Sequence, residues 1–292
     1  MKHTGYKPEP TAPDHYFLGS KKLTERYGAV ILMPGGHGWK QYLPAPEDQS
    51  NRYIEPEDCT IANALKAWET VANKLKADGV LKDTDFPKNC SERFNAICAN
   101  IGPEGGSPFT SANSIASNGV IPENVLPFDD KIRTWDEFYH PKPMTDDFKK
   151  LAEDCTKYIN LQREWVFNDV SGQITMSEKL EKIQAALERG VVCVSVYAWN
   201  DPVNGLYEKS LGQSDCHWTL MYDQDGVSKI FDTYAPYYKD VFQDFQSAIL
   251  YTMSRKTDEE VSRENTLIGL YQKLIGLLQQ MIDLIKTGAW IR

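Results

Sequence analysis

The chain has 292 residues, of which 41% are hydrophobic and 25% charged, and its formal net charge is −9. This length can bury a core in one large domain or two smaller ones. The acidic balance, without a block rich in Lys and Arg, argues against nonspecific binding to nucleic acid or anionic membranes. No run approaches the ~18 apolar residues of a membrane span, and the first residues lack the apolar segment of a signal peptide. We therefore expect a cytoplasmic or virion-associated protein.

The cysteines show neither the spacing of a zinc site nor that of a disulfide framework, because no CxxC unit occurs. We therefore expect free thiols in a reducing compartment and no metal or organic cofactor. The six are Cys59, Cys90, Cys98, Cys155, Cys193 and Cys216.

The first part of the chain is rich in Pro, Gly and aromatic residues. Residues 1–50 are predicted to form an irregular leader packed on the body, with one short strand at 29–33. Apolar side chains then recur at helical spacing over residues 59–77, and Asp58 is a reasonable N-cap for that helix. Further helices, or helix-favouring stretches, are expected at 91–100, 110–117, 145–166 and 176–189.

The pattern changes at Gly190, where β-branched residues fill 191–198 and predict a central strand. Two more strand-like runs follow, one starting at His217 and one ending at Asp232. Helices followed by strands indicate an α+β organisation. We predict a domain at 51–255, with a helical lobe at about 51–165 and a β lobe at about 166–255.

The last segment, 256–292, is predicted to be a charged linker and an amphipathic helix. Over 267–285 its apolar residues are alternately four and three positions apart, which is the spacing of a coiled-coil seam. Packing of this helix on its own domain, self-association in an assembly and binding at a membrane surface all remain open. The seam consists of Leu267, Tyr271, Leu274, Leu278, Met281 and Ile285.

Three residues in this order suggest nucleophilic catalysis. Cys59 stands at a helix start, where the helix dipole lowers a thiol pKa. His217 lies on a strand and can take the proton, and Asp232 ends the next strand and can orient the imidazole. A core cysteine, a core histidine and a turn aspartate are the alternative interpretations.

Several runs in this order resemble the papain-like cysteine peptidases, closer to the divergent members of bacteria and phages. The similarity extends over roughly residues 45–245. The matching runs are CSERFNAIC at 90–98, GGSP at 105–108, ANSIASNGVIPENVLPF at 112–128, GVVCVSVYA at 190–198, CHWTL at 216–220 and IFDTY at 230–234.

The resemblance implies a two-lobed fold, with a helical lobe and an antiparallel β-sheet or barrel, and the C-terminal helix added to it. It implies a Cys59–His217–Asp232 triad that cleaves peptide or isopeptide bonds in a peptide or protein substrate. Gln49 would be the side-chain donor to the oxyanion, and Tyr234 the aromatic cover of Asp232.

The sequence also departs from the family pattern. Thr60 stands where a Trp follows the nucleophile, and Asp58 places a carboxyl beside the thiol. Two other functions therefore stay open. One is a catalytically inactive structural or binding subunit of an assembly such as a phage virion, and the other is a cell-wall amidase or transglutaminase-like acyl transferase.

Overall fold

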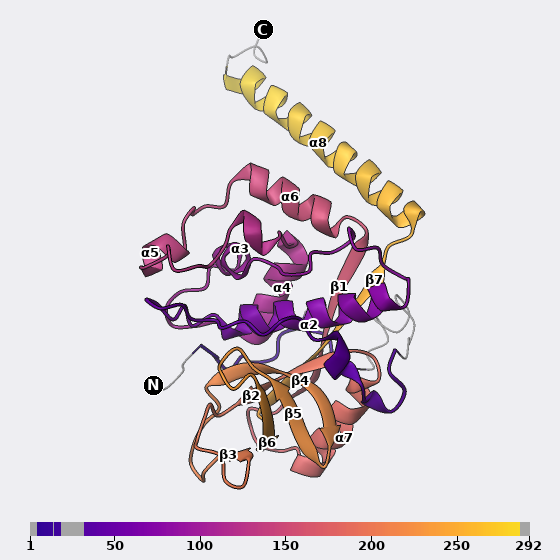
Figure 1. The fold of residues 1–292 in the computed structure, drawn as a ribbon. Helices are drawn as coiled ribbons and strands as arrows, with labels where there is room; N and C mark the ends of the chain where they lie inside the picture. Colours follow the sequence, from indigo (N-terminus) through magenta and orange to yellow (C-terminus); the bar gives the residue numbers. More distant parts are fainter. Residues whose placement is uncertain (1–4, 14, 19–31, 287–292) are drawn as a thin grey trace. The chain divides into compact units, whose positions relative to one another are not determined.

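The computed structural model describes residues 5–13, 15–18 and 32–286. It separates into two compact units, Met1–Ser254 and Arg255–Arg292, and each is described by itself (Figure 1). The strand predicted at 29–33 falls mostly on residues 29–31, which lie outside the described part.

The regular structure described in the first half of the larger unit is helical. The predicted helix at 59–77 is present as α2, and its flanking helices begin and end within two residues of their predicted positions. Ser91 accepts a hydrogen bond from the Phe94 N–H at 3.2 Å and so caps α3. The elements are η1 (Pro34–Gly36), η2 (Trp39–Tyr42), α2 (Cys59–Ala77), α3 (Glu92–Cys98), α4 (Pro108–Asn118), η3 (Glu123–Val125), α5 (Trp135–Phe138), α6 (Asp146–Thr156) and α7 (Met176–Leu187).

A seven-stranded sheet follows, in the order β1-β7-β2-β4-β5-β6-β3. The central pairs β2–β4, β2–β7, β4–β5 and β5–β6 are antiparallel, whereas β3 pairs with β6 in parallel. The strands are β1 (Ile159–Asn168), β2 (Val191–Val196), β3 (Leu206–Glu208), β4 (His217–Asp225), β5 (Val227–Phe231), β6 (Tyr238–Phe242) and β7 (Ser247–Arg255).

The prediction of helix over 145–166 is right only as far as Thr156. Residues 159–168 instead form β1, in which Trp165 and Phe167 are buried. The polar residues of this stretch hide the pattern of a strand. The strand lies at the edge of the sheet, and the rest of the fold buries it.

Helix α2 is the element on which the two kinds of structure meet. It packs against α3 and α4 on one side and against β2 and β4 on the other, and Figure 1 shows it between them. Asn63 of α2 donates to the Cys59 carbonyl at 3.2 Å and to the Trp218 carbonyl of β4 at 2.7 Å. One buried amide therefore ties the first turn of α2 to the strand that begins at His217.

The smaller unit consists mainly of α8 (Asp258–Lys286). Among the described residues, no helix has the length and apolar character needed to cross a bilayer.

Replacing Asn63 by Ala should lower the free energy of unfolding by about 1–3 kcal/mol, because the buried Trp218 carbonyl loses its donor. Urea unfolding followed by circular dichroism measures this change. Asn118→Ala is the matched control, since Asn118 is exposed and bonds only within its own helix turn, so it should change stability by about 0.5 kcal/mol or less. Equal effects of the two substitutions would contradict the role given to Asn63.

Candidate active site

Cys59 is the first residue of α2, and its side chain is fully buried. The first N–H groups of a helix have no partner within the helix, so the Cys59 N–H points out of its N-terminus together with the positive end of the dipole. The Asn63 side-chain amide bridges the Cys59 carbonyl and the carbonyl of Trp218, the residue after His217. The structure thus brings the predicted nucleophile to the start of β4.

His217 and Asp232 form a buried pair. The His217 Nε2 lies 2.7 Å from the Asp232 Oδ1, and both side chains have no exposed surface. An ionised carboxylate only accepts hydrogen bonds, so Nε2 carries the proton of this contact. That tautomer makes Nδ1 the ring atom that can take a proton from a thiol.

The Asp232 carboxylate has partners on both oxygens. Oδ1 also accepts from the Thr233 N–H at 2.8 Å, while Oδ2 accepts from Lys239 Nζ at 2.7 Å and from Trp199 Nε1 at 2.8 Å. Burial by itself would raise the pKa of Asp232, but His217 and Lys239 hold it well below its usual range. Asp232 is therefore ionised across the neutral range.

Sequence reasoning missed Lys239 and Trp199. Lys239 lies seven residues after Asp232 on the next strand, and Trp199 follows β2. Only the pairing of β5 with β6 reveals the lysine. The predicted aromatic neighbour Tyr234 lies near, with its ring centroid 5.2 Å from that of His217.

Gln49 is buried next to this group but makes other contacts. Its Nε2 donates to Glu55 Oε1 at 2.8 Å, and its Oε1 accepts from Thr233 Oγ1 at 2.6 Å. The side-chain amide predicted to bind an oxyanion is thus hydrogen-bonded to a carboxyl group.

Residues 5–7, here called the covering segment, lie directly over Cys59. A Cβ atom placed on Gly5 would come within 2.9 Å of Cys59 Sγ and 2.7 Å of the Glu57 carbonyl oxygen. The segment pairs in parallel with Gly106, which donates to the Gly5 carbonyl at 2.9 Å and accepts from the Lys7 N–H at 3.0 Å. Only a residue without a side chain fits at position 5.

Tyr6 anchors the covering segment on the strand side. Its ring stacks on Trp218, with centroids 5.8 Å apart, and its hydroxyl lies 2.9 Å from Ser247 Oγ. Its N–H donates to the Cys216 carbonyl at 3.4 Å. The segment therefore contacts both the helical side and the sheet side of the Cys59 thiol.

Comparison with known proteins identifies the fold of the chain. No protein-family profile matches the chain, and no curated protein matches it in sequence. Among solved structures, digestive procathepsin L2 proteinase from Tenebrio molitor larval midgut has a TM-score of 0.53 at 14% identity, over 86% of this chain and 78% of that one. The chain has a papain-like fold. Xylellain, a cysteine protease from Xylella fastidiosa, has a TM-score of 0.51 at 16% identity, over 88% of this chain and 96% of xylellain.

Within this papain-like fold, the Cys59 thiol lies in an environment that opposes its ionisation. Burial raises the pKa of Cys59 well above its usual range, the Trp218 backbone lowers it, and the charges of Asp58 and Glu57 raise it further. Because burial is the largest cause and Gly5 lies on the sulfur, the covering segment contributes to keeping the thiol protonated.

Asp58 occupies the N-cap position of α2, as predicted, but its side chain makes no capping bond. Neither carboxyl oxygen has a hydrogen-bond partner among the described residues. Burial, followed by the charge of Glu55, raises the pKa of Asp58 well above its usual range. The carboxyl group is thus driven towards its neutral form beside Cys59. The preceding Glu57 has a φ of 56°, a conformation that favours glycine.

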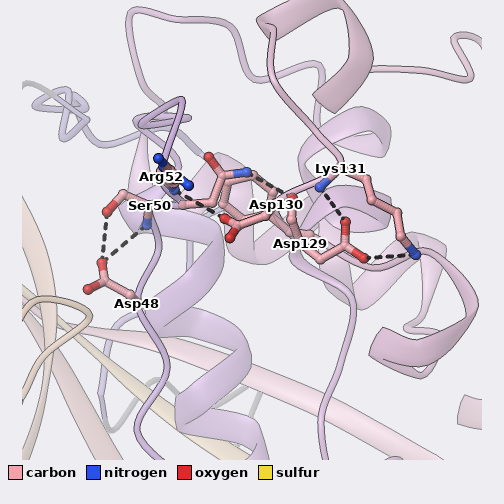
Figure 2. Close-up of a pocket in the computed structure, with 8 residues that line it drawn as sticks. Asp48, Ser50, Arg52, Asp129, Asp130 and Lys131 are labelled. Carbon is pink, nitrogen blue, oxygen red and sulfur yellow. Dashed lines mark hydrogen bonds and ion pairs between the residues drawn. The ribbon is translucent and has the colours of Figure 1, made fainter.

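An open pocket of about 800 Å³ lies elsewhere, between residues 48–52 and 128–131 (Figure 2). Its charged groups bond to one another, as when Lys131 Nζ approaches Asp129 Oδ2 at 3.6 Å. It is lined by loop residues and not by Cys59, His217 or Asp232. Within the described residues, no three His, Cys, Asp or Glu side chains group as metal ligands, and all six cysteines are free.

Asp58→Asn should stabilise the protein at high pH relative to the native sequence. A buried acid with a raised pKa contributes stability at low pH, and this is lost as the pH rises above the value of the unfolded chain. The variant should therefore be more stable by on the order of 1–2 kcal/mol at pH 8, and the difference should shrink towards pH 4. Urea unfolding at several pH values measures it, and a difference independent of pH would contradict the assignment.

Proposed function

We propose that this protein is a papain-like cysteine hydrolase that cleaves peptide or isopeptide bonds through Cys59, His217 and Asp232. One observation carries the proposal. His217 Nε2 bonds to Asp232 at 2.7 Å, while the Asn63 amide ties the backbone of Cys59 to that of Trp218, the residue next to His217. A helix-start thiol, an imidazole and an orienting carboxylate then have the order that nucleophilic catalysis needs.

In the first half of the reaction, His217 Nδ1 takes the thiol proton and the Cys59 sulfur attacks the substrate carbonyl carbon. A carbon–sulfur bond forms and the carbonyl π electrons move onto the oxygen. The imidazolium then gives its proton to the leaving amine as the carbon–nitrogen bond breaks, which leaves a thioester on Cys59. Asp232 keeps the imidazole in one tautomer throughout.

In the second half, a water molecule gives a proton to His217 while the water oxygen attacks the thioester carbon. The carbon–sulfur bond then breaks, the acid product leaves, and the proton returns to the Cys59 site. In this proposal the Cys59 N–H at the helix start donates to the oxyanion of both intermediates. Gln49 is the second donor in this proposal, and its side chain must then exchange its bond to Glu55 for one to the oxyanion.

The covering segment must leave Cys59 before a substrate carbonyl can reach the sulfur. Gly5 is in contact with Cys59 Sγ, and Tyr6 covers Trp218 beside it. The proposed enzyme is therefore in a closed state, and its activity depends on release of residues 5–7.

A catalytically inactive subunit of a larger assembly is the second candidate. The acidic groups Glu55, Glu57 and Asp58 around the thiol favour it, because each raises the pKa of Cys59. A cell-wall amidase or acyl transferase would use the same three groups. Release of amino groups from peptidoglycan, compared with casein, separates that activity from a peptidase.

Gly5→Val tests the proposal without removing any part of the chain. Overpacking of about 1–3 kcal/mol at the contact with Cys59 should shift the closed state towards release. Alkylation of Cys59 by iodoacetamide and hydrolysis of peptides should both rise severalfold, by at most about 30-fold, because the closed state is favoured by no more than about 2 kcal/mol. Mass spectrometry identifies the alkylated residue, and a fluorogenic peptide library measures hydrolysis.

Two controls make the result interpretable. Gly102→Ala changes a glycine whose Cβ would meet nothing within 4 Å, and it should leave both rates unchanged. Gly5→Val combined with Cys59→Ala should abolish hydrolysis. If Gly5→Val exposes Cys59 to alkylation but neither casein nor peptidoglycan is cleaved, the enzyme proposal fails and the inactive subunit is favoured.

A further inference from the structure

The apolar surface of α8 is wider than the seam of a two-stranded coiled coil. With Leu267, Leu274 and Met281 at the d positions of a heptad, Tyr271, Leu278 and Ile285 take the a positions. The flanking positions are apolar as well. Ile268, Ile275 and Ile282 occupy e, and Leu270, Leu277 and Leu284 occupy g.

The seven-residue period is regular. Residues 267–273 (LIGLYQK) and 274–280 (LIGLLQQ) share five of seven residues, and 281–285 (MIDLI) continues the pattern. A strict seven-residue apolar repeat produces a left-handed supercoil with other helices. Packing on the irregular surface of a globular unit makes no such demand.

The e and g positions normally carry Glu and Lys, which flank a pair of helices with salt bridges. Here the e and g positions are both Ile or Leu. With a single partner helix, the apolar side chains at one or both of these positions would stay exposed to water. Twelve large apolar side chains form a surface on the order of 1,000 Å², above the roughly 300–600 Å² of the largest patch on ordinary monomers. Each helix therefore needs a neighbour on both sides.

The remaining face argues against a lipid surface as the occupant. Its members are mainly Gly and Gln, and over 267–286 only Lys273, Asp283 and Lys286 are charged. Helices that lie on anionic membranes carry many Lys and Arg on this face.

We propose that α8 assembles with the α8 helices of further copies of this chain into a bundle of three or more helices. Full-length protein at micromolar concentration should then have a mass at least three times 33.2 kDa by sedimentation equilibrium. Leu274→Gln with Leu278→Gln should give monomers, because polar side chains replace the seam. Gln279→Glu, on the polar face, is the matched control and should leave the mass unchanged.

Charging the flanks separates a wide bundle from a simple pair. Ile275→Glu with Leu277→Lys should reduce the assembly to a dimer, since the seam stays apolar while the flanks become those of a two-stranded coil. A monomeric full-length protein overturns the proposal, whether α8 then packs on its own chain or binds vesicles of anionic lipid. A dimer that the flank substitutions leave unchanged overturns the wide bundle.

A second inference concerns Lys239 and rests on the proposed function. Its side chain is 1% exposed, and its Nζ donates to Asp232 Oδ2 at 2.7 Å, to the Tyr234 carbonyl at 2.7 Å and to the Pro236 carbonyl at 2.6 Å. All three ammonium protons are therefore used. The ammonium also lies 5.2 Å from the centre of the Trp199 ring.

The charge of Lys239 offsets the cost of burying the Asp232 carboxylate. A buried carboxylate without a counter-charge costs several kcal/mol, and an amide in its place would cost far less. Paired with Lys239, Asp232 offers His217 a hydrogen-bond acceptor while the pair as a whole carries no net charge. The other acidic groups near the thiol are Glu55, Glu57 and Asp58, from the segment before α2, and burial drives Asp58 towards its neutral form.

The geometry points to Lys239 as a positioning residue that neutralises Asp232 and sets the pH range in which Cys59 reacts. The test follows the rate of Cys59 alkylation against pH in proteins that all carry Gly5→Val. Lys239→Met leaves an extra negative charge and should move the profile up by about one pH unit. Asp232→Asn leaves an extra positive charge and should move it down by a similar amount.

The double variant separates an effect of the Lys239 charge from a purely structural role of this lysine. Asp232→Asn with Lys239→Met restores a neutral pair and should return the profile to its original position. A purely structural lysine predicts lower stability with an unmoved profile, and that result overturns the inference, as does a double variant that stays displaced. Alkylation needs no hydrolysis, so a failure of the proposed peptidase activity is seen separately, in the peptide assay.

Discussion

The Asp232 carboxylate, held between His217 and Lys239, depends on three consecutive strands lying side by side. In the β4–β5 pair Leu220 lies opposite Phe231, so the next step places Asp232 opposite Thr219, whose hydroxyl donates to it at 3.3 Å. His217 is two residues from Thr219 and therefore projects from the same face of the sheet. The β5–β6 pair brings Lys239 to the other carboxylate oxygen. The register of the sheet thus assembles the ionic part of the site.

Around the Cys59 sulfur the constraint is different, because the chain segments there pack so closely that some positions have no room for a side chain. Gly105 has a φ of 80°, and a Cβ on it would lie 2.1 Å from the Gly5 carbonyl oxygen. Gly106 likewise leaves room for the Ile101 side chain and for the Thr60 hydroxyl. Thr60, which departs from the Trp of the papain-like pattern, lies with its hydroxyl 2.8 Å from that of Ser111. A small hydroxyl side chain here fits a crowded helix start, and it need not mark a loss of function.

The sequence was sufficient for the elements whose pattern is local. Helix α2 begins at Cys59 and ends at Ala77 as predicted, because its apolar spacing and its N-cap position are both encoded within the segment. The papain-like fold was predicted from the order of the motifs and is confirmed by the structural comparison. The strand β1 was missed because its burial comes from distant partners such as Tyr16, whose carbonyl accepts from the Trp165 N–H at 2.7 Å.

The same distinction holds within the site. Cys59, His217 and Asp232 could be proposed because each has a recognisable local setting, whereas their mutual geometry and the roles assigned to them needed the fold. Lys239 gives no local signal, since a lysine on a strand near the end of a sheet is usually solvated. The covering segment is even less visible, because Gly5 lies about 100 residues before Gly106, and Tyr6 lies 241 residues before Ser247.

The contacts of the covering segment nearly balance the cost of ordering it, so a closed site is compatible with the proposed activity. Three backbone hydrogen bonds contribute on the order of 3 kcal/mol net, and burial of the Tyr6 ring adds about 2 kcal/mol. Fixing the backbone of three residues costs about 3–6 kcal/mol. Because the difference is small, a substrate of the proposed enzyme that makes the same backbone bonds to Gly106 and fills the place of Tyr6 would displace the segment. Release also lowers the pKa of Cys59, since burial is the main cause that raises it, so opening the site and activating the thiol are one event.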